Sequence, residues 1–146
     1  MKITKHHFFA PLLLCGALNA QAVEFQVATG IGTQYGFLGA QLNAIEGDTK
    51  YYVSAGILGA GLGFSTAFSD DKKVAVGAAV SRFFGIFGSH TDITGLTLNY
   101  RANGFASRGW DFGIGVGYYE RTENSWSSGD RFESGAALTF NVGYAF

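Results

Sequence analysis

The last fifteen residues of the chain, 132–146, alternate between two kinds of side chain. The first set is mostly large and apolar or aromatic: Phe132, Ser134, Ala136, Leu138, Phe140, Val142, Tyr144 and Phe146. The second set is small or polar: Glu133, Gly135, Ala137, Thr139, Asn141, Gly143 and Ala145. Period-2 alternation is typical of a β-strand, and these two faces suit a strand that has lipid on one side and a lumen on the other. The chain is therefore predicted to end in a membrane-spanning β-strand.

The first 22 residues have the three parts of a secretory signal peptide. Lys2 and Lys5 supply a positive start, and Phe8–Leu18 is an apolar run too short to span a bilayer as a helix. Ala20 and Ala22 frame a small-x-small cleavage site. We therefore predict that this segment is a cleaved signal peptide.

The mature chain, residues 23–146, has the length of one domain. Cys15 offers an alternative, a lipid-anchored start, but Leu14 precedes it where lipoprotein signals usually carry a small residue. Cys15 is the only cysteine, so the mature domain has no disulfide framework, and a closed hydrogen-bonded barrel is another way to hold it together. Without Lys2 and Lys5 it has 8 Lys+Arg against 11 Asp+Glu, which gives no support for nucleic-acid binding.

Clusters of Gly, Asp, Asn and Ser mark where the chain reverses. Four reversals are clear, at 46–49, 69–73, 102–109 and 122–130, and three less marked ones lie at 30–33, 58–61 and 88–90. Together they predict an antiparallel transmembrane β-barrel of eight strands, at about 23–30, 34–45, 50–58, 61–68, 74–87, 91–101, 110–121 and 132–146. The reversal at 58–61 is the weakest, because alternation runs straight through it and places Tyr52 on the same face as Leu62. A soluble β-sandwich is the alternative fold.

The parity of a residue, that is, whether it falls on the odd or the even positions of a strand, assigns the two faces of the later strands. Five residues of 110–118 are predicted to face lipid: Trp110, Phe112, Ile114, Val116 and Tyr118. Strict alternation in 74–87 would also place Arg82 in lipid, at a cost of about 2–4 kcal/mol near the midplane. We therefore expect a β-bulge near Ser81–Phe83 that turns Arg82 inward and Phe83 and Phe87 outward.

The inward face is predicted to hold three acids and three bases, namely Glu24, Arg82, Arg101, Asp111, Arg121 and Glu133. Buried charges must pair or be hydrated, so these residues predict an internal salt-bridge network, with a charged constriction in a narrow pore as the alternative. Many other inward positions are small: Gly77, Ala79, Gly113, Gly115, Gly117 and Ala137. Such residues either allow a tightly curved wall or leave space for water, a lipid tail or a small ligand.

The terminal strand carries a family resemblance. Its final Phe and the apolar or aromatic residues at alternate positions before it resemble the closing strand of small outer-membrane β-barrel proteins of Gram-negative bacteria, the OmpA-, OmpX- and OmpW-like group. These residues are Leu138, Phe140, Val142, Tyr144 and Phe146. The resemblance implies location in the outer membrane, periplasmic chaperones as partners during biogenesis, and recognition of this strand by the barrel assembly machinery. It implies no particular activity.

The predicted function is a structural or envelope-integrity role for a monomeric barrel whose lumen is filled by side chains. A narrow, porin-like channel or carrier for small or apolar molecules is the alternative. A lipid-modifying enzyme would need a nucleophile beside the only mature histidine, His90, but adjacent Ser89 points to the opposite face of a strand. Ser81, Ser128 or Ser134 could approach His90 only through the fold. One histidine with scattered acids predicts no metal site and no cofactor.

Overall fold

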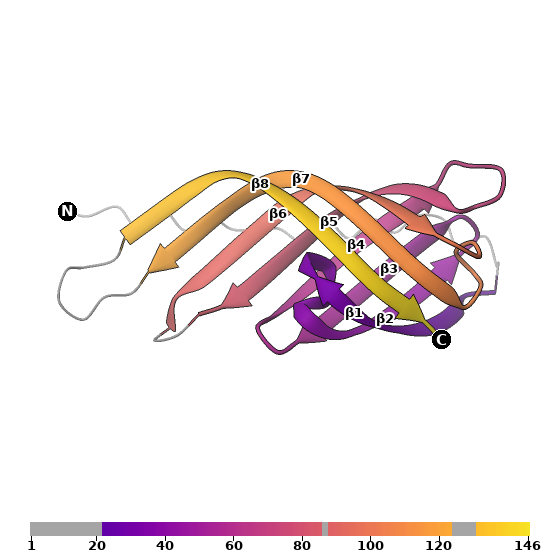
Figure 1. The fold of residues 1–146 in the computed structure, drawn as a ribbon, viewed down its shortest axis with the longest axis horizontal. Helices are drawn as coiled ribbons and strands as arrows, with labels where there is room; N and C mark the ends of the chain where they lie inside the picture. Colours follow the sequence, from indigo (N-terminus) through magenta and orange to yellow (C-terminus); the bar gives the residue numbers. More distant parts are fainter. Residues whose placement is uncertain (1–21, 86–87, 124–130) are drawn as a thin grey trace.

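The structure, a computed structural model, describes residues 22–85, 88–123 and 131–146, and these form one closed antiparallel β-barrel (Figure 1). Its eight strands follow one another around the barrel in chain order. They are β1 (Glu24–Gly32), β2 (Phe37–Glu46), β3 (Thr49–Gly56), β4 (Gly59–Ala67), β5 (Val74–Phe84), β6 (His90–Arg101), β7 (Gly109–Glu123) and β8 (Arg131–Ala145). The predictions of an all-β fold and of eight strands are confirmed.

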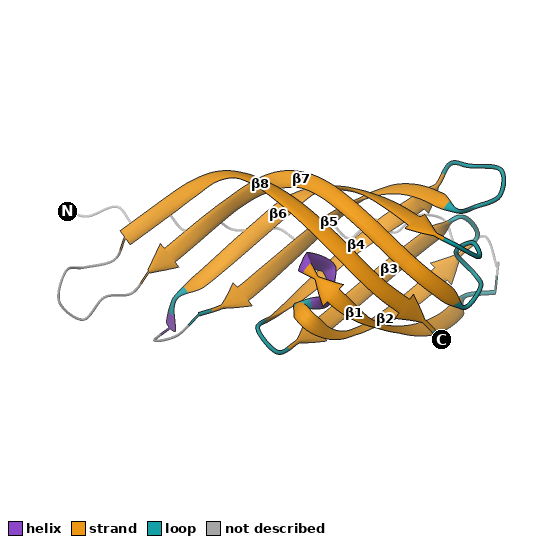
Figure 2. Cartoon of the chain, in the orientation of Figure 1, coloured by secondary structure: helices purple, strands orange, loops and turns teal. Residues whose placement is uncertain are grey.

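Helical structure in the described residues is confined to short turns (Figure 2). The main one is the 3-10 turn η1 (Thr33–Tyr35), which separates β1 from β2. None of the described helices is long and apolar enough to cross a membrane.

The weakest predicted reversal is real. Ala55 pairs with Ala60, so the chain turns between β3 and β4 through residues 57–58. Because the turn is so short, the parity of the faces changes between the two strands. Tyr52 therefore lies inside the barrel and Leu62 outside, and the expectation that they share a face was wrong.

The strands are strongly staggered. The stagger is seen by starting at Ala28 of β1 and moving from each residue to its partner on the next strand. This path around the barrel reaches Gly135 of β8. Ala28 itself pairs with Ala145, ten residues beyond Gly135 along β8. Such a stagger requires strands that are tilted steeply to the barrel axis.

The two ends of the barrel differ. We call the end that carries Phe146 and the turns 47–48, 68–73 and 102–108 the basal end, and the opposite end the distal end. At the basal end the strands end at similar levels along the barrel. At the distal end β5–β8 extend beyond β1–β4 (Figure 1).

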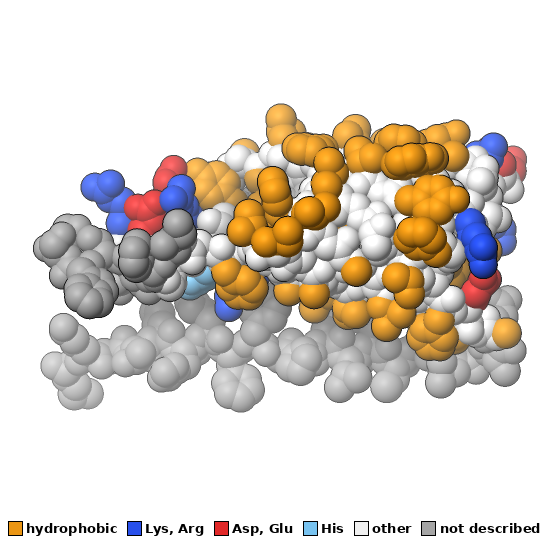
Figure 3. Space-filling model, turned by 60° about the horizontal axis from the view of Figure 1, so that its bottom comes forward, with side chains coloured by type: hydrophobic (Ala, Val, Ile, Leu, Met, Phe, Trp, Pro, Cys, Tyr) orange, Lys and Arg blue, Asp and Glu red, His pale blue; other side chains and the backbone are white. Residues whose placement is uncertain are grey.

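The outer wall is apolar and the interior is polar, as parity predicted. All five residues assigned outward on β7 are exposed, as are Val76, Val80, Leu96, Leu98 and Phe140. The buried polar and charged residues are Gln26, Gln34, Gln41, Asn43, Lys50, Ser54, Ser65, Ser81, Thr97, Asn99, Arg101, Asp111 and Asn141. In Figure 3, apolar side chains spread over the middle of the molecule, while charged side chains gather at its two ends.

The predicted bulge in β5 does not form. Val74–Phe84 keeps an unbroken register with β6, and Ala60 of β4 lies directly opposite Arg82. Arg82 therefore faces outward, where its side chain is 55% exposed and forms a bidentate ion pair with Asp92 on the neighbouring strand β6. The stagger places Arg82 at the distal edge of the apolar wall rather than at its middle, so nothing forces it inward. Phe83 stays on the inward parity, and Phe87 lies outside the described residues.

The seam between the first and last strands is the shortest pairing in the barrel. β1 and β8 share five residue pairs, from Ala28↔Ala145 to Gly32↔Asn141. Beyond Gly32 the chain turns inward as η1, so in the described part of the structure the rest of β8 pairs with β7 alone.

Candidate functional site in the barrel lumen

Three charged side chains meet near the basal end of the lumen. Nζ of Lys50 lies 3.1 Å from Oδ2 of Asp111, and Nη2 of Arg101 donates to the same oxygen at 3.0 Å. Lys50 and Arg101 are fully buried and Asp111 nearly so. Arg101 and Asp111, two of the six charges predicted for the lumen, thus form an ion pair inside it, and Lys50 is a third member that the sequence reading missed.

The groups around this triad stabilise its excess of positive charge. Nη1 of Arg101 donates to Oε1 of Gln26 and to the carbonyl of Phe105, the latter at 2.7 Å. The Lys50 ammonium lies 5.4 Å from the ring centre of Phe105 and 5.7 Å from that of Tyr52. Aromatic faces and amide oxygens thus stabilise the two cations that share one carboxylate.

Phe105 closes the basal end. It belongs to the 102–108 turn, which folds into the barrel mouth and buries this ring. The backbone N–H of Phe105 donates to the carbonyl of Lys72 at 3.2 Å, and Nε2 of Gln26 donates to the carbonyl of Ser107 at 3.4 Å. A long turn that the sequence predicted as a simple reversal is therefore a plug.

A second plug is η1, which enters the lumen from the seam. Gly32 and Gly36 flank it with positive φ angles of 115° and 62°, which turn the chain into the barrel and out again. The backbone N–H of Gln34 donates to Oδ1 of Asn141 at 2.7 Å, and its side chain donates to Oδ1 of Asn99 at 3.0 Å. Gln34 and Tyr35 are both buried, so η1 fills the lumen with its own side chains.

The small inward residues make room for these large ones. A Cβ on Gly143 would collide with the Tyr35 hydroxyl, and one on Gly30 would lie 2.9 Å from the Tyr35 ring. A Cβ on Gly63 would likewise lie 2.6 Å from the Tyr52 hydroxyl. At these positions the glycines accommodate filled space rather than create a channel.

The four other charged residues predicted for the lumen do not join the triad. Glu24 is exposed at the basal end of β1, and Arg82 is on the outer wall. Arg121 and Glu133 pair in register but lie on the projecting part of β7 and β8, where Arg121 bridges to Glu123 at 2.7 Å and Glu133 accepts from the Tyr119 hydroxyl at 3.1 Å. Parity predicted their face correctly, but the stagger and the unequal strand lengths place them at a different height from the triad.

Several buried polar groups have no hydrogen-bond partner among the described residues. They are Oε1 of Gln41, both amide atoms of Asn43, the hydroxyls of Tyr52 and Ser65, Nε of Arg101 and Nδ2 of Asn141. A buried polar group left without a partner costs about 1–3 kcal/mol. Seven such atoms, kept dry, would cost about as much as the whole stability of a typical domain, about 5–15 kcal/mol.

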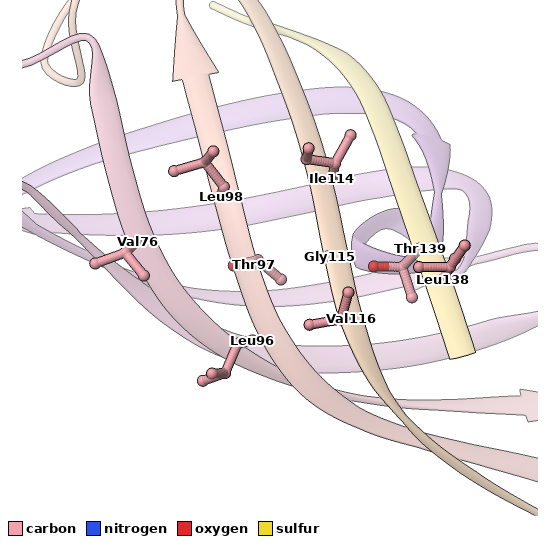
Figure 4. A pocket seen from close by; sticks show the side chains of 9 residues that line it. All are labelled: Val76, Leu96, Thr97, Leu98, Ile114, Gly115, Val116, Leu138 and Thr139. Atoms are coloured by element: carbon pink, nitrogen blue, oxygen red, sulfur yellow. The ribbon is translucent and has the colours of Figure 1, made fainter. Parts of the chain in front are cut away.

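The outer wall carries shallow apolar grooves over β5–β8. One, of about 460 Å³, is lined mainly by aliphatic side chains from all four strands (Figure 4). A second, of about 490 Å³, shares Leu98 and Ile114 with it and continues past the aromatic residues Tyr100, Phe112 and Phe140.

His90 shares the outward parity of Asp92 at the distal end of β6. Ser81 lies on the opposite face, because its hydroxyl is buried and donates to the carbonyl of Thr33 at 3.0 Å. Ser134 borders the same surface hollow as His90, and Ser128 lies outside the described residues. No group of three or more metal-ligating side chains occurs within the described segments.

The outward residues of the last strand form an aromatic cluster at the basal end. The Tyr144 ring lies 5.6 Å from that of Trp110 and 5.2 Å from that of Phe146. The N–H of Phe146 donates to the carbonyl of Val27 at 2.9 Å, so the chain end is fixed against β1. Ala20, on the N-terminal side of the predicted cleavage site, lies outside the described residues.

Comparisons with models of protein families, with curated proteins and with solved structures found no match to this chain.

Proposed function

We propose that this chain is a monomeric outer-membrane β-barrel of a Gram-negative cell envelope, with a structural or envelope-integrity role. The observation that carries the proposal is the inverted distribution of polarity: large apolar side chains cover the outer wall, and polar side chains fill the interior. A barrel in water buries apolar groups and exposes polar ones, whereas a barrel in lipid does the reverse.

Two further features support a membrane setting. Trp110, Tyr144 and Phe146 cluster at the basal edge of the apolar wall, where interfacial aromatic girdles occur. The Arg82–Asp92 ion pair lies at the distal edge, at the depth of lipid headgroups. The grooves over β5–β8 fit the acyl chains of the surrounding lipid. In this arrangement the basal end faces the periplasm, and the chain reaches the membrane through periplasmic chaperones and the barrel assembly machinery.

The filled lumen supports a structural role over transport. Phe105 closes the basal end, η1 fills the middle, and the triad lies between them. An eight-stranded barrel is just wide enough for side chains to fill. We expect no steady ion current from the refolded mature protein in a planar bilayer, with heat-modifiable migration confirming the folded state. A steady, ion-selective current would instead favour the channel.

Membrane insertion is tested by placing a charge on the outer wall. Ile114 is 64% exposed at the middle of the apolar wall, and Phe132 is 76% exposed on the projecting part of β8. In a bilayer Ile114→Arg should lower the free energy of unfolding by about 2–4 kcal/mol, because it places a cation in hydrocarbon. Phe132→Arg, beyond the apolar wall, should change it by less than about 0.5 kcal/mol. Urea unfolding in lipid vesicles measures both, and equal small effects would contradict membrane insertion.

A further inference from the structure

One side of the lumen has more polar groups than the protein itself satisfies. On β6–β8, Asn99 and Asn141 accept from η1 and Asp111 accepts from two cations, and the atoms left without a partner are Nε of Arg101 and Nδ2 of Asn141. On β2–β4, by contrast, Gln41, Asn43, Tyr52 and Ser65 each carry a buried polar atom without a partner in the described chain. All four are at least 95% buried on the inward face.

These groups are neighbours. Asn43 pairs in register with Tyr52, and Lys50 with Ser65. Lys50 lies two residues from Tyr52 on the same face of β3, and its ammonium makes one hydrogen bond, to Asp111, within the described residues. The group therefore combines unused donors and unused acceptors on one continuous surface, which is the chemistry that water satisfies.

We infer that the β2–β4 wall of the lumen binds a cluster of internal water molecules, which bridge Asn43, Tyr52 and Ser65 and solvate the free side of the Lys50 ammonium. The site would explain how two buried cations share the single carboxylate of Asp111. A separate cavity of about 10 Å³ beside η1, lined by Thr33, Gln34 and Ser81 together with apolar residues such as Ile93 and Leu96, is at the lower limit of space for one water. Phe105 and η1 close the lumen on either side, so these waters would be retained rather than form a conducting column. The inference concerns the interior and does not depend on what covers the outer wall.

The sign of one stability change tests the site. Tyr52→Phe removes only the buried hydroxyl. If that hydroxyl bonds water, its loss should raise the unfolding equilibrium constant about two- to tenfold and lower the urea midpoint. If the hydroxyl is dry, the same change removes an unsatisfied group and leaves the midpoint unchanged or higher, which would overturn the inference. Tyr51→Phe, on the exposed face of the same strand, is the matched control for loss of a tyrosine hydroxyl.

A direct measurement on the unaltered protein completes the test. In refolded protein in detergent micelles, the side-chain amide protons of Asn43 should show NMR cross-relaxation with long-lived water. Absence of this signal, with the signals of Asn43 assigned, would overturn the inference whatever the behaviour of the variant. Asn99, whose side-chain amide donates to the Thr97 hydroxyl at 3.1 Å, provides the comparison amide.

Discussion

Replacing Asp111 with alanine is expected to lower the free energy of unfolding by about 3–5 kcal/mol, the cost of breaking a buried ion pair from one side. Asp111 is the only carboxylate in contact with Lys50 and Arg101 among the described residues, and both cations are fully buried. Without it, two positive charges would face each other in a closed lumen. The loss is a large share of the roughly 5–15 kcal/mol that stabilises an ordinary domain, so the variant should refold poorly.

Asp92→Ala is the matched control for Asp111→Ala. Asp92 also pairs with an arginine across neighbouring strands, but on the outer wall, where the Arg82 side chain is 55% exposed. Exposed pairs contribute about 0–1 kcal/mol. Urea unfolding of both variants, followed by tryptophan fluorescence, gives the comparison. Equal losses in the two variants would show that burial of the triad does not matter in the way we describe.

Replacing Tyr35 with alanine should be the second large effect. Tyr35 lies inside the seam, in a buried cluster with Ala28 and Ala145 and against the bare backbone of Gly30 and Gly143. Truncating a buried aromatic ring to alanine costs about 3–5 kcal/mol, because a cavity remains where the ring packed. This cavity would lie next to the five pairs that close the barrel, so the seam itself should loosen.

Conductance of the refolded variants tests whether Tyr35 and Phe105 block the lumen or only stabilise the barrel by packing. Tyr35→Ala alone should stay silent in a planar bilayer, because Phe105 still closes the basal end. Combined with Phe105→Ala it should give intermittent current steps. Tyr51→Ala, which removes an aromatic ring of the same kind from the outer wall, should leave the bilayer silent. Silence of the double variant, with heat-modifiable migration confirming a folded barrel, would contradict the proposed plugs.

The sequence predicted the strands of this barrel and the faces of their residues better than the contacts inside the lumen. Strand positions and faces follow from period-2 alternation. Alternation reflects local backbone geometry, so it can be read from one strand without knowledge of its neighbours. Asp111 and Arg101 were assigned to the lumen by alternation along their own strands, and in the structure they lie directly opposite each other. Glu24, Arg121 and Glu133 were placed with them because alternation specifies a face but no height along the barrel axis. Height depends on the stagger, which is a property of the closed sheet.

The missed residues had weaker signals. Lys50 alternates with Tyr52 and Ser54 against Tyr51 and Val53, so its inward parity was readable once the reversal at 57–58 was known. η1 had a signal in the two glycines that enclose Thr33–Tyr35, but a glycine pair also marks an ordinary hairpin turn. The inward path of Phe105 had no local signal, because it depends on the shape of the basal mouth that it fills.

The short seam also governs the order of events in folding. β1 and β8 are the most distant strands in sequence, and their five pairs involve β8 residues no earlier than Asn141. The hairpins from β1–β2 to β7–β8 can form from near neighbours, but the contact that turns the sheet into a barrel has the longest loop to close, and such contacts form late. A sheet in which residues 141–145 have not docked on β1 has two free edges, and free edges make a β-protein prone to aggregate.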